Sequence, residues 1–141
     1  MKFFTTIFVF LVGAVLINKI QMSEIEIATY EEIKDLPNHP EKLLIDVREP
    51  HELESTGKIP TSINIPLSKV KDALSNLDEN DFKNTYGRTK PTKEDEIIFS
   101  CLLGGRAQKG AEAAVDLGYK NVKNYKGSWT EYAQKEGLKV E

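Results

Sequence analysis

The residue in this chain best suited to covalent chemistry is its only cysteine, Cys101. It ends an apolar run, residues 96–101, whose composition favours a β-strand. Two glycines and an arginine follow within five residues, and then comes an alanine-rich stretch of helical character, residues 107–117. The pattern predicts a strand, a loop and a helix in that order. Ligands bind at the carboxyl ends of strands in open α/β sheets, so we expect Cys101 to lie in such a crevice.

The loop after Cys101 has the composition of an anion-binding ring. Its residues are Leu102, Leu103, Gly104, Gly105 and Arg106. Cysteine reacts as a thiolate, which is favoured near a helix N-terminus and a cation. We expect the backbone amides of the loop to surround the sulfur, since glycine permits close approach of the backbone. The loop residues are therefore predicted to bind substrate and Cys101 to be the nucleophile. The alternative interpretation is a buried structural cysteine.

The spacing between Cys101 and Arg106 distinguishes between two candidate reactions, phosphate hydrolysis and sulfur transfer. Phosphatases that form a cysteinyl-phosphate place one residue more between these two residue types, and the larger ring holds a phosphate. Here residue 107, where such an arginine would stand, is alanine. A tighter ring suits one extra sulfur atom, so the spacing favours sulfur transfer over phosphate hydrolysis.

A second pair of charged residues follows the buried strand predicted at residues 43–45. Asp46 and Arg48 stand at the carboxyl end of that strand, where they are either catalytic or a structural pair. We favour the structural interpretation for Asp46, because a buried acid beside an arginine usually organises the backbone. Arg48 is expected to add positive potential near the pocket. Both are predicted to support the site.

Composition limits the remaining function classes. A chain of 141 residues has room for one domain with a proper core. The net charge is −3 and the lysines are scattered among acids, which argues against nucleic acid as a partner. A single cysteine excludes an internal disulfide, and His39 and His51 lie in polar, loop-like surroundings. We therefore predict no metal site.

The first 21 residues are expected to lie outside the folded domain, which we place at residues 22–141. Residues 3–17 are almost wholly apolar. They predict a signal-anchor whose residues 3–20 insert into the membrane. The alternative is a leader that is absent from a mature protein starting near Met22. The first alternative predicts an anchored domain in a reducing compartment, and the second a cytoplasmic or mitochondrial protein.

The hydrophobic pattern predicts an α/β domain. We expect short strands at residues 25–28, 43–45, 59–66, 96–101 and 122–125, and helices at residues 30–36, 49–56, 69–77, 107–117 and 129–135, with one further helical turn at 82–86. Capping boxes are predicted at Thr29 with Glu32 and at Ser128 with Glu131. Strands that alternate with helices predict a mainly parallel, five-stranded sheet with helices on both faces.

Four blocks of the sequence resemble the rhodanese family. The resemblance is greatest to its single-domain thiosulfate sulfurtransferases and to the rhodanese-like proteins of the insect heat-shock gene cluster. The blocks are Asp46-Val47-Arg48-Glu49, Gly57-Lys58-Ile59-Pro60 with Ser62-Ile63-Asn64-Ile65-Pro66, Cys101 to Arg106, and Tyr125-Lys126-Gly127-Ser128-Trp129. The resemblance covers about residues 25–138. It implies that Cys101 carries sulfur, that the amides of the loop hold the persulfide and that Arg106 binds an anionic donor. It also implies a structural role for Asp46.

The same resemblance implies a double displacement without metal or organic cofactor. A small-molecule donor, thiosulfate or a persulfide, would leave its sulfane sulfur on Cys101, and a thiol acceptor such as glutathione or thioredoxin would remove it. The oligomeric state stays open. Two departures stand out: Lys58 replaces a frequent histidine, and Leu102 replaces a frequent basic residue. The apolar pair Leu102 and Leu103 at the mouth of the site argues against thiosulfate as the natural donor and favours a bulkier or less charged partner, such as a low-molecular-weight persulfide or a protein thiol. The alternative function is a non-enzymatic module of the same fold for protein binding or redox sensing.

Overall fold

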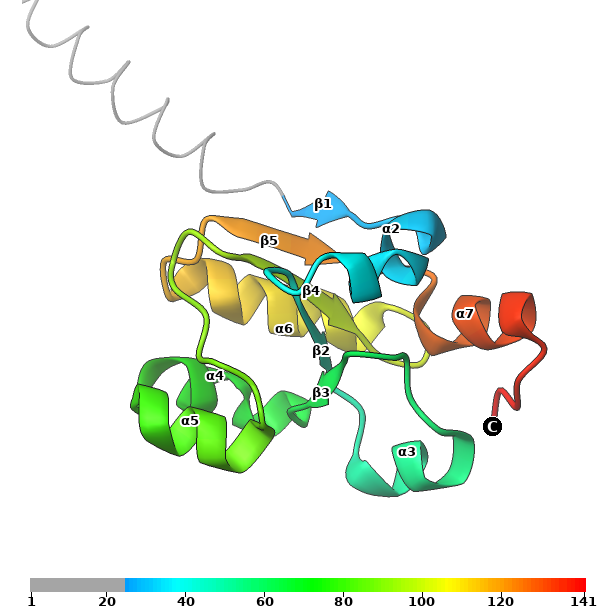
Figure 1. Ribbon diagram of the computed structural model, residues 1–141, viewed down its shortest axis with the longest axis horizontal. Helices are drawn as coiled ribbons and strands as arrows, with labels where there is room; N and C mark the ends of the chain where they lie inside the picture. Colours follow the sequence, from blue (N-terminus) through cyan, green and yellow to red (C-terminus); the bar gives the residue numbers. More distant parts are fainter. Residues whose placement is uncertain (1–24) are drawn as a thin grey trace, which may run out of the picture.

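The computed structural model describes residues 25–141, so the predicted N-terminal anchor or leader lies outside the described residues. The domain is an α/β fold (Figure 1). Its strands are β1 (Glu26–Ile27), β2 (Leu43–Asp46), β3 (Ile63–Asn64), β4 (Glu96–Ser100) and β5 (Asn121–Asn124). Its helices are α2 (Tyr30–Lys34), the 3₁₀ helix η1 (Leu36–Asn38), α3 (Pro50–Thr56), α4 (Leu67–Ser75), α5 (Glu79–Tyr86), α6 (Gly105–Asp116) and α7 (Ser128–Glu136).

The five strands form one sheet in the order β1-β5-β4-β2-β3. Every strand pairing within residues 25–141 is parallel, as predicted. Asp46 of β2 is in register with Ser100 of β4, the residue before Cys101. Because the strands are parallel, their carboxyl ends meet at one edge of the sheet. The end of β2 and the cysteine loop are therefore neighbours.

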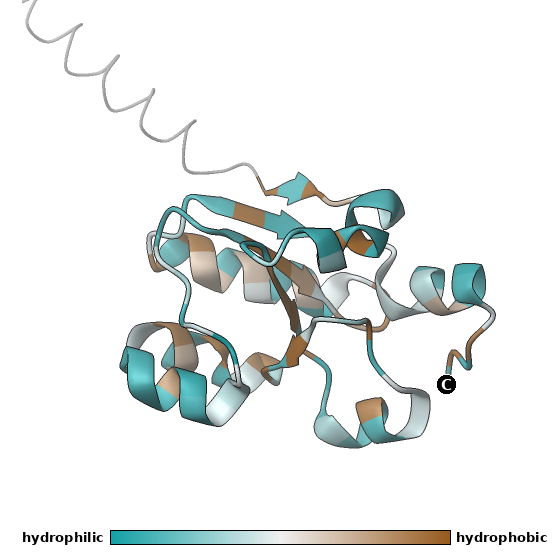
Figure 2. Ribbon diagram, viewed as in Figure 1, coloured by the Kyte–Doolittle hydropathy of each residue, from teal (hydrophilic) through white to brown (hydrophobic). Residues whose placement is uncertain are grey.

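Alternate residues of the central strands supply two separate cores, because successive side chains of a strand point to opposite faces. Leu43 and Ile45 belong to a core covered by α4, α5 and α6, and Leu44 and Ile98 belong to a core covered by α2, η1 and α7. Figure 2 shows the central strands as the apolar centre of the domain, with more polar helix surfaces around them. The prediction of helices on both faces is therefore confirmed.

Helix α6 packs unusually close to the sheet. Gly110 faces Phe99 of β4, and a Cβ on Gly110 would lie 2.9 Å from the Phe99 ring. The absence of a side chain lets the helix approach the strand that carries Cys101. This contact fixes the position of α6, whose first turn contains Arg106.

Prolines shorten two of the predicted elements. The strand predicted between the prolines of residues 59–66 covers only Ile63–Asn64, because Pro60 and Pro66 have no N–H for a strand ladder. The helix predicted at 30–36 ends at Lys34 and continues as the 3₁₀ turn that contains Pro37. The predicted single turn near residue 82 is a full eight-residue helix, α5. Between residues 25 and 141, no helix has the length and apolar character needed to cross a membrane.

Candidate active site

Cys101 lies where the sequence places it, directly after β4 and four residues before α6 begins. Cys101 is 1% exposed to solvent. Among the loop amides, the Gly104 N–H donates a hydrogen bond to Sγ, with N and Sγ 3.0 Å apart. Charge on the sulfur strengthens such a bond, so this contact favours a thiolate over a neutral thiol. The described loop thus reaches the sulfur through one amide rather than through the whole predicted ring.

Gly104 is a glycine for two structural reasons. Its φ of +95° lies in the left-handed region, which residues with a Cβ rarely adopt. A Cβ here would also lie 2.5 Å from the carbonyl oxygen of Lys126. Gly105 differs, since it is exposed, begins α6 and has open space around the position of a Cβ. Only the first of the two loop glycines is therefore required by the geometry.

The start of α7 holds the cysteine loop in place. The Ser128 Oγ accepts a hydrogen bond from the Cys101 backbone N–H at 3.1 Å and donates one to the carbonyl of Tyr125 at 2.8 Å. The N–H groups of Trp129 and Thr130 donate to the carbonyls of Cys101 and Leu102 at 2.9 and 3.2 Å. The first turn of this helix therefore binds both peptide groups around the nucleophile.

The capping box predicted at Ser128 and Glu131 is wrong. No side chain caps α7, and Glu131 instead accepts a hydrogen bond from the Tyr125 hydroxyl at 2.8 Å. Burial raises the pKa of Tyr125, and this carboxylate raises it further. The role of Ser128 in holding the loop is missing from the sequence analysis. Its signal was the position of the Gly127-Ser128-Trp129 segment after the neighbouring strand, at the same edge of the sheet.

Arg106 is bound by a carboxylate that the sequence analysis did not single out. Its two terminal nitrogens donate to the two oxygens of Glu52 at 2.8 and 2.9 Å. The Arg106 guanidinium lowers the pKa of Glu52 to about 2, against an ordinary 4.5. Glu52 also raises the pKa of Arg106, and the nearby Cys101 contributes to this increase. The predicted anion-binding cation is therefore partly neutralised. The signal available in the sequence for this partner was the position of Glu52 in the helix that follows β2.

Asp46 and Arg48 form a buried ion pair, as the structural interpretation predicts. The pair is 1% and 0% exposed, and the Asp46 carboxylate accepts from Nε and Nη2 of Arg48. The remaining guanidinium N–H groups reach the hydroxyl of Thr56 and the carbonyl of Gly57 at the end of α3. The Arg48 guanidinium also lies 5.1 Å from the centre of a Trp129 ring. Arg48 thus ties α3 and α7 to the end of β2.

The two leucines after the nucleophile have different surroundings. Leu103 is 71% exposed at the tip of the loop. Leu102 is partly buried against the core beneath α7, and it lines a pocket of about 270 Å³. The opposite walls of this pocket are α3 and the tail residues Val140 and Glu141. Leu102 is therefore the residue of the cysteine loop that reaches this pocket.

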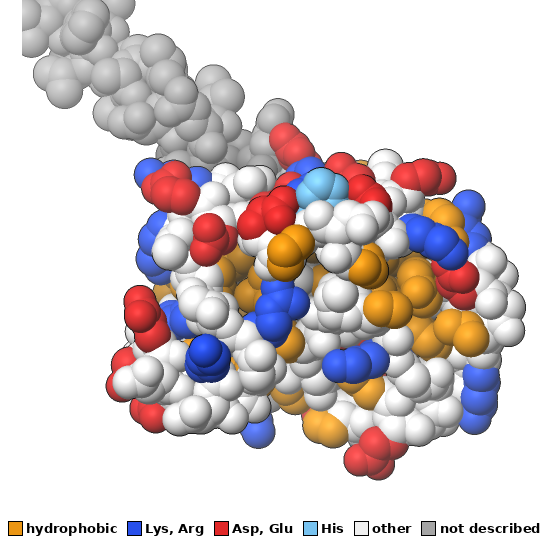
Figure 3. Space-filling model, in the orientation of Figure 1, with side chains coloured by type: hydrophobic (Ala, Val, Ile, Leu, Met, Phe, Trp, Pro, Cys, Tyr) orange, Lys and Arg blue, Asp and Glu red, His pale blue; other side chains and the backbone are white. Residues whose placement is uncertain are grey.

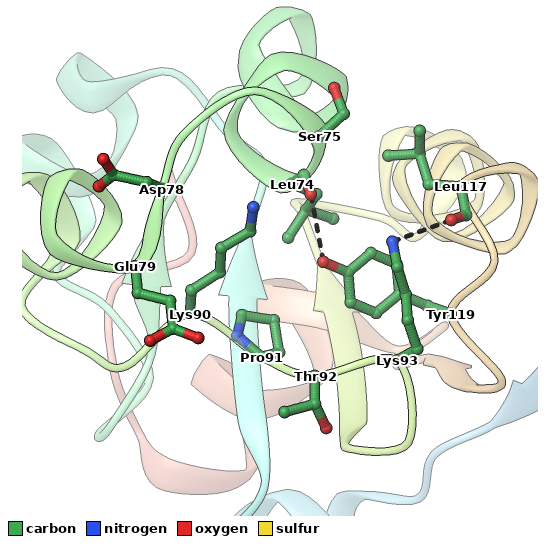
Figure 4. Close-up of a pocket in the computed structure, with 10 residues that line it drawn as sticks. All are labelled: Leu74, Ser75, Asp78, Glu79, Lys90, Pro91, Thr92, Lys93, Leu117 and Tyr119. Atoms are coloured by element: carbon green, nitrogen blue, oxygen red, sulfur yellow. Dashed lines mark hydrogen bonds between the residues drawn. The ribbon is translucent and has the colours of Figure 1, made fainter.

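A larger pocket, of about 680 Å³, lies away from this chemistry (Figure 4). Its lining includes residues before β4 and before β5, so it lies at the amino edge of the sheet. The Lys93 amine there donates to the Leu117 carbonyl at 2.9 Å, and the Tyr119 hydroxyl donates to the Leu74 carbonyl at 3.2 Å (Figure 4). These polar groups close the ends of helices. No residue predicted for the site lines this pocket.

Basic and acidic side chains are interspersed on the face shown in Figure 3. Carboxylates hold both arginines near the carboxyl edge of the sheet, Arg48 and Arg106. The site is therefore small and nearly balanced in charge, with a single thiol held at a helix start.

The fold and the site together define an α/β domain with a cysteine loop between a central strand and a helix. A model of the rhodanese-like domain matches residues 29–135. Rhodanese domain-containing protein CG4456 of Drosophila melanogaster is 58% identical over 111 residues, which are 79% of this chain and 99% of that protein. Thiosulfate sulfurtransferase RDL2, mitochondrial, of Saccharomyces cerevisiae is 41% identical over 117 residues, 82% of this chain and 77% of that protein.

The structure of the human single-domain sulfurtransferase TSTD1 superposes with a TM-score of 0.72 and 32% identity, covering 79% of this chain and 98% of that one. This chain belongs to the rhodanese family. The resemblance found in the four sequence blocks is thereby confirmed, both to single-domain sulfurtransferases and to an insect rhodanese-domain protein.

Proposed function

We propose that this protein is a sulfurtransferase that carries a sulfane sulfur as a persulfide on Cys101. The observation that supports this most directly is the hydrogen bond from the Gly104 N–H to Sγ at the start of α6. A thiolate formed there needs no histidine base, because the amide and the helix N-terminus stabilise the charge. The family and the names of its thiosulfate sulfurtransferases support the reaction class.

The first half-reaction loads the enzyme. The Cys101 thiolate attacks the outer sulfur of thiosulfate, or of a low-molecular-weight persulfide. A sulfur–sulfur bond forms to Cys101 while the donor's own sulfur–sulfur bond breaks, and sulfite or a thiolate leaves with the electron pair. Gly104 is placed to hold the attacking Sγ, and Arg106 to attract the donor, within the limit set by its pairing with Glu52.

The second half-reaction removes the sulfur from Cys101. A thiophilic acceptor attacks the outer sulfur of the persulfide, and the Cys101 thiolate is released. Glutathione, a thioredoxin or a related thiol would serve in a cell, and cyanide in an assay. Covalent transfer of this kind predicts ping-pong kinetics. RDL2 and another curated relative, in Schizosaccharomyces pombe, carry mitochondrial names, which supports a mitochondrial location as one possibility for this chain.

Intact-mass measurement tests the proposal. Protein incubated with thiosulfate alone is expected to gain the mass of one sulfur atom, and cyanide or glutathione is expected to remove it. The Cys101→Ser variant, which is nearly isosteric, is expected to gain nothing and to turn over neither acceptor. A folded wild-type protein without adduct or turnover would contradict the proposal and favour the binding or sensing module. Hydrolysis of an aryl phosphate would instead favour the alternative that the protein is a cysteine phosphatase.

A further inference from the structure

We infer that the 270 Å³ pocket beside the cysteine loop binds the apolar, uncharged end of a small thiol acceptor, and that the C-terminal tail is the wall that selects it. This inference rests on the proposed sulfur transfer and concerns its second half-reaction. Three features carry it: the construction of the tail, the composition of the pocket, and the charge state of its neighbours.

The tail is built into the site. Gly137, with φ of +70°, ends α7 and turns the chain. The carbonyl of Lys139 accepts a hydrogen bond from Trp129 Nε1 at 3.1 Å, and the Lys139 amine donates to Ser55 of α3 at 3.3 Å. Val140 packs against the core beneath α7, as Leu102 does. The tail thus bridges α7 and α3 across the pocket and presents Val140 to its interior.

The pocket contains apolar contacts on two sides. Leu102 comes from the cysteine loop and Val140 from the tail, while Ser55 and Thr56 of α3 form the wall between them. Its volume lies just below the range typical of pockets for drug-sized ligands. Among the acceptors proposed above, it therefore matches a small thiol with an apolar body better than the surface of a thioredoxin.

The charges at the pocket disfavour an anionic acceptor. Arg48 lies in the lining, but its guanidinium is held by Asp46, Thr56 and Gly57. Arg106 is held by both oxygens of Glu52. Glu52 itself lines the pocket, as does Glu141. Arg48 and Glu52 are therefore both paired, and the remaining charged group of the described lining is the Glu141 carboxylate, beside the imidazole of His51. An acceptor carboxylate would meet the like charge of Glu141 and no unpaired arginine or lysine among the described lining residues, so glutathione, which carries two carboxylates, is expected to be a poorer acceptor than an uncharged thiol.

The reaction step conserves atoms and electrons. The acceptor thiolate, R–S⁻, attacks the outer sulfur of the Cys101 persulfide. A new sulfur–sulfur bond gives R–S–S⁻ after proton exchange, and the old bond breaks with its electron pair on Cys101. The R group occupies the space between Leu102 and Val140 during this attack. Cyanide performs the same step without an R group, so it does not need the pocket.

The test compares three acceptors: benzyl mercaptan, 3-mercaptopropionate and cyanide. Val140→Trp is designed to fill the pocket from the tail, and Ser55→Trp from α3. Leu138→Trp is the matched control, since Leu138 is in the same tail, is 47% exposed and does not line the pocket. Each variant is compared with the wild type on the same thiol, so the intrinsic reactivity of the thiol cancels.

We expect each filling variant to lower kcat/KM for benzyl mercaptan at least about tenfold relative to its effect on cyanide, the scale of discrimination in an apolar pocket. The wild type is expected to prefer benzyl mercaptan to 3-mercaptopropionate, and Leu138→Trp to behave as the wild type. Equal losses for all acceptors, or no loss for benzyl mercaptan, would overturn the inference. Absence of a persulfide in the wild type would refute the proposed function itself, which the mass measurement shows separately. If Val140→Trp does not fold, Ser55→Trp gives the same comparison.

Discussion

The backbone of Gly104 lies against the carbonyl of Lys126, so closely that a Cβ on Gly104 would come within 2.5 Å of that oxygen. The two residues are far apart in sequence but follow β4 and β5, which are neighbours in the sheet. The contact brings the cysteine loop against the segment that leads into α7. It makes Gly104 the most constrained residue of the loop.

Gly104→Ala is therefore expected to destabilise the protein and to abolish persulfide formation. The positive φ alone costs a residue with a Cβ about 1–3 kcal/mol, and the collision with Lys126 adds to it. Gly118→Ala is the control, because Gly118 has φ of +94° and open space around the position of a Cβ. Urea unfolding measures both. Equal losses for the two variants would show that the contact with Lys126 is unimportant.

Asp46→Asn is expected to lower the free energy of unfolding by about 3–5 kcal/mol, because it leaves the buried Arg48 charge without its counter-ion. The loss is not expected to depend on the presence of thiosulfate. Glu94→Gln breaks an exposed pair with Lys120 and should barely change stability. Denaturant titrations of the two variants make the comparison. An Asp46→Asn protein as stable as the wild type would remove the structural role assigned to the pair.

The pair of Glu52 and Arg106 predicts a specific acid sensitivity. The pKa of Glu52 is lowered from an ordinary 4.5 to about 2, so the carboxylate stabilises the folded protein fully above pH 4.5. That contribution is lost as the pH falls from about 4.5 towards 2, because the unfolded chain takes up the proton first. Glu52→Gln lacks the titrating group and should lose less stability over this interval than the wild type. Parallel stability curves for the two proteins would argue against the pairing.

Ser128→Ala is expected to weaken the site without removing the nucleophile. It deprives the buried Cys101 N–H of its acceptor, a loss of about 1–3 kcal/mol in stability. Because the cysteine is then less firmly positioned, persulfide formation from thiosulfate should slow. Ser75→Ala removes an exposed hydroxyl that donates to the Lys71 carbonyl, and it should change neither property. Unchanged loading rates in Ser128→Ala would show that α7 supports the fold but not the reaction.

Leu102→Arg is expected to lower the KM for thiosulfate by about two- to fivefold, the effect of one added exposed charge on an anion. The reason is that Arg106, the nearest cation of the loop, is already paired with Glu52. Leu102→Gln separates charge from loss of the apolar side chain and should not lower this KM. The effect of the arginine should shrink as salt is added. An unchanged KM in Leu102→Arg would refute the idea that Leu102 disfavours thiosulfate.

Local patterns predicted much of this fold. The alternation of apolar residues and the position of prolines and glycines predicted the order of strands along the chain and the helix after Cys101. They succeeded because strands and helices are specified by residues near one another in sequence. Boundaries moved where Pro37, Pro60 and Pro66 interrupt regular hydrogen bonding, as in the two-residue strand β3.

The sequence by itself identified the candidate nucleophile, the loop after it and the family, because these lie in contiguous blocks of residues. Only the tertiary structure decided which groups surround that loop. Glu52 pairs with Arg106 across 54 positions, and Ser128 reaches Cys101 across 27. Ser128 satisfies the requirements of a cap in the sequence, yet it bonds to Cys101 because the parallel sheet brings the ends of β4 and β5 together. Such partners depend on chain topology, which no local spacing encodes.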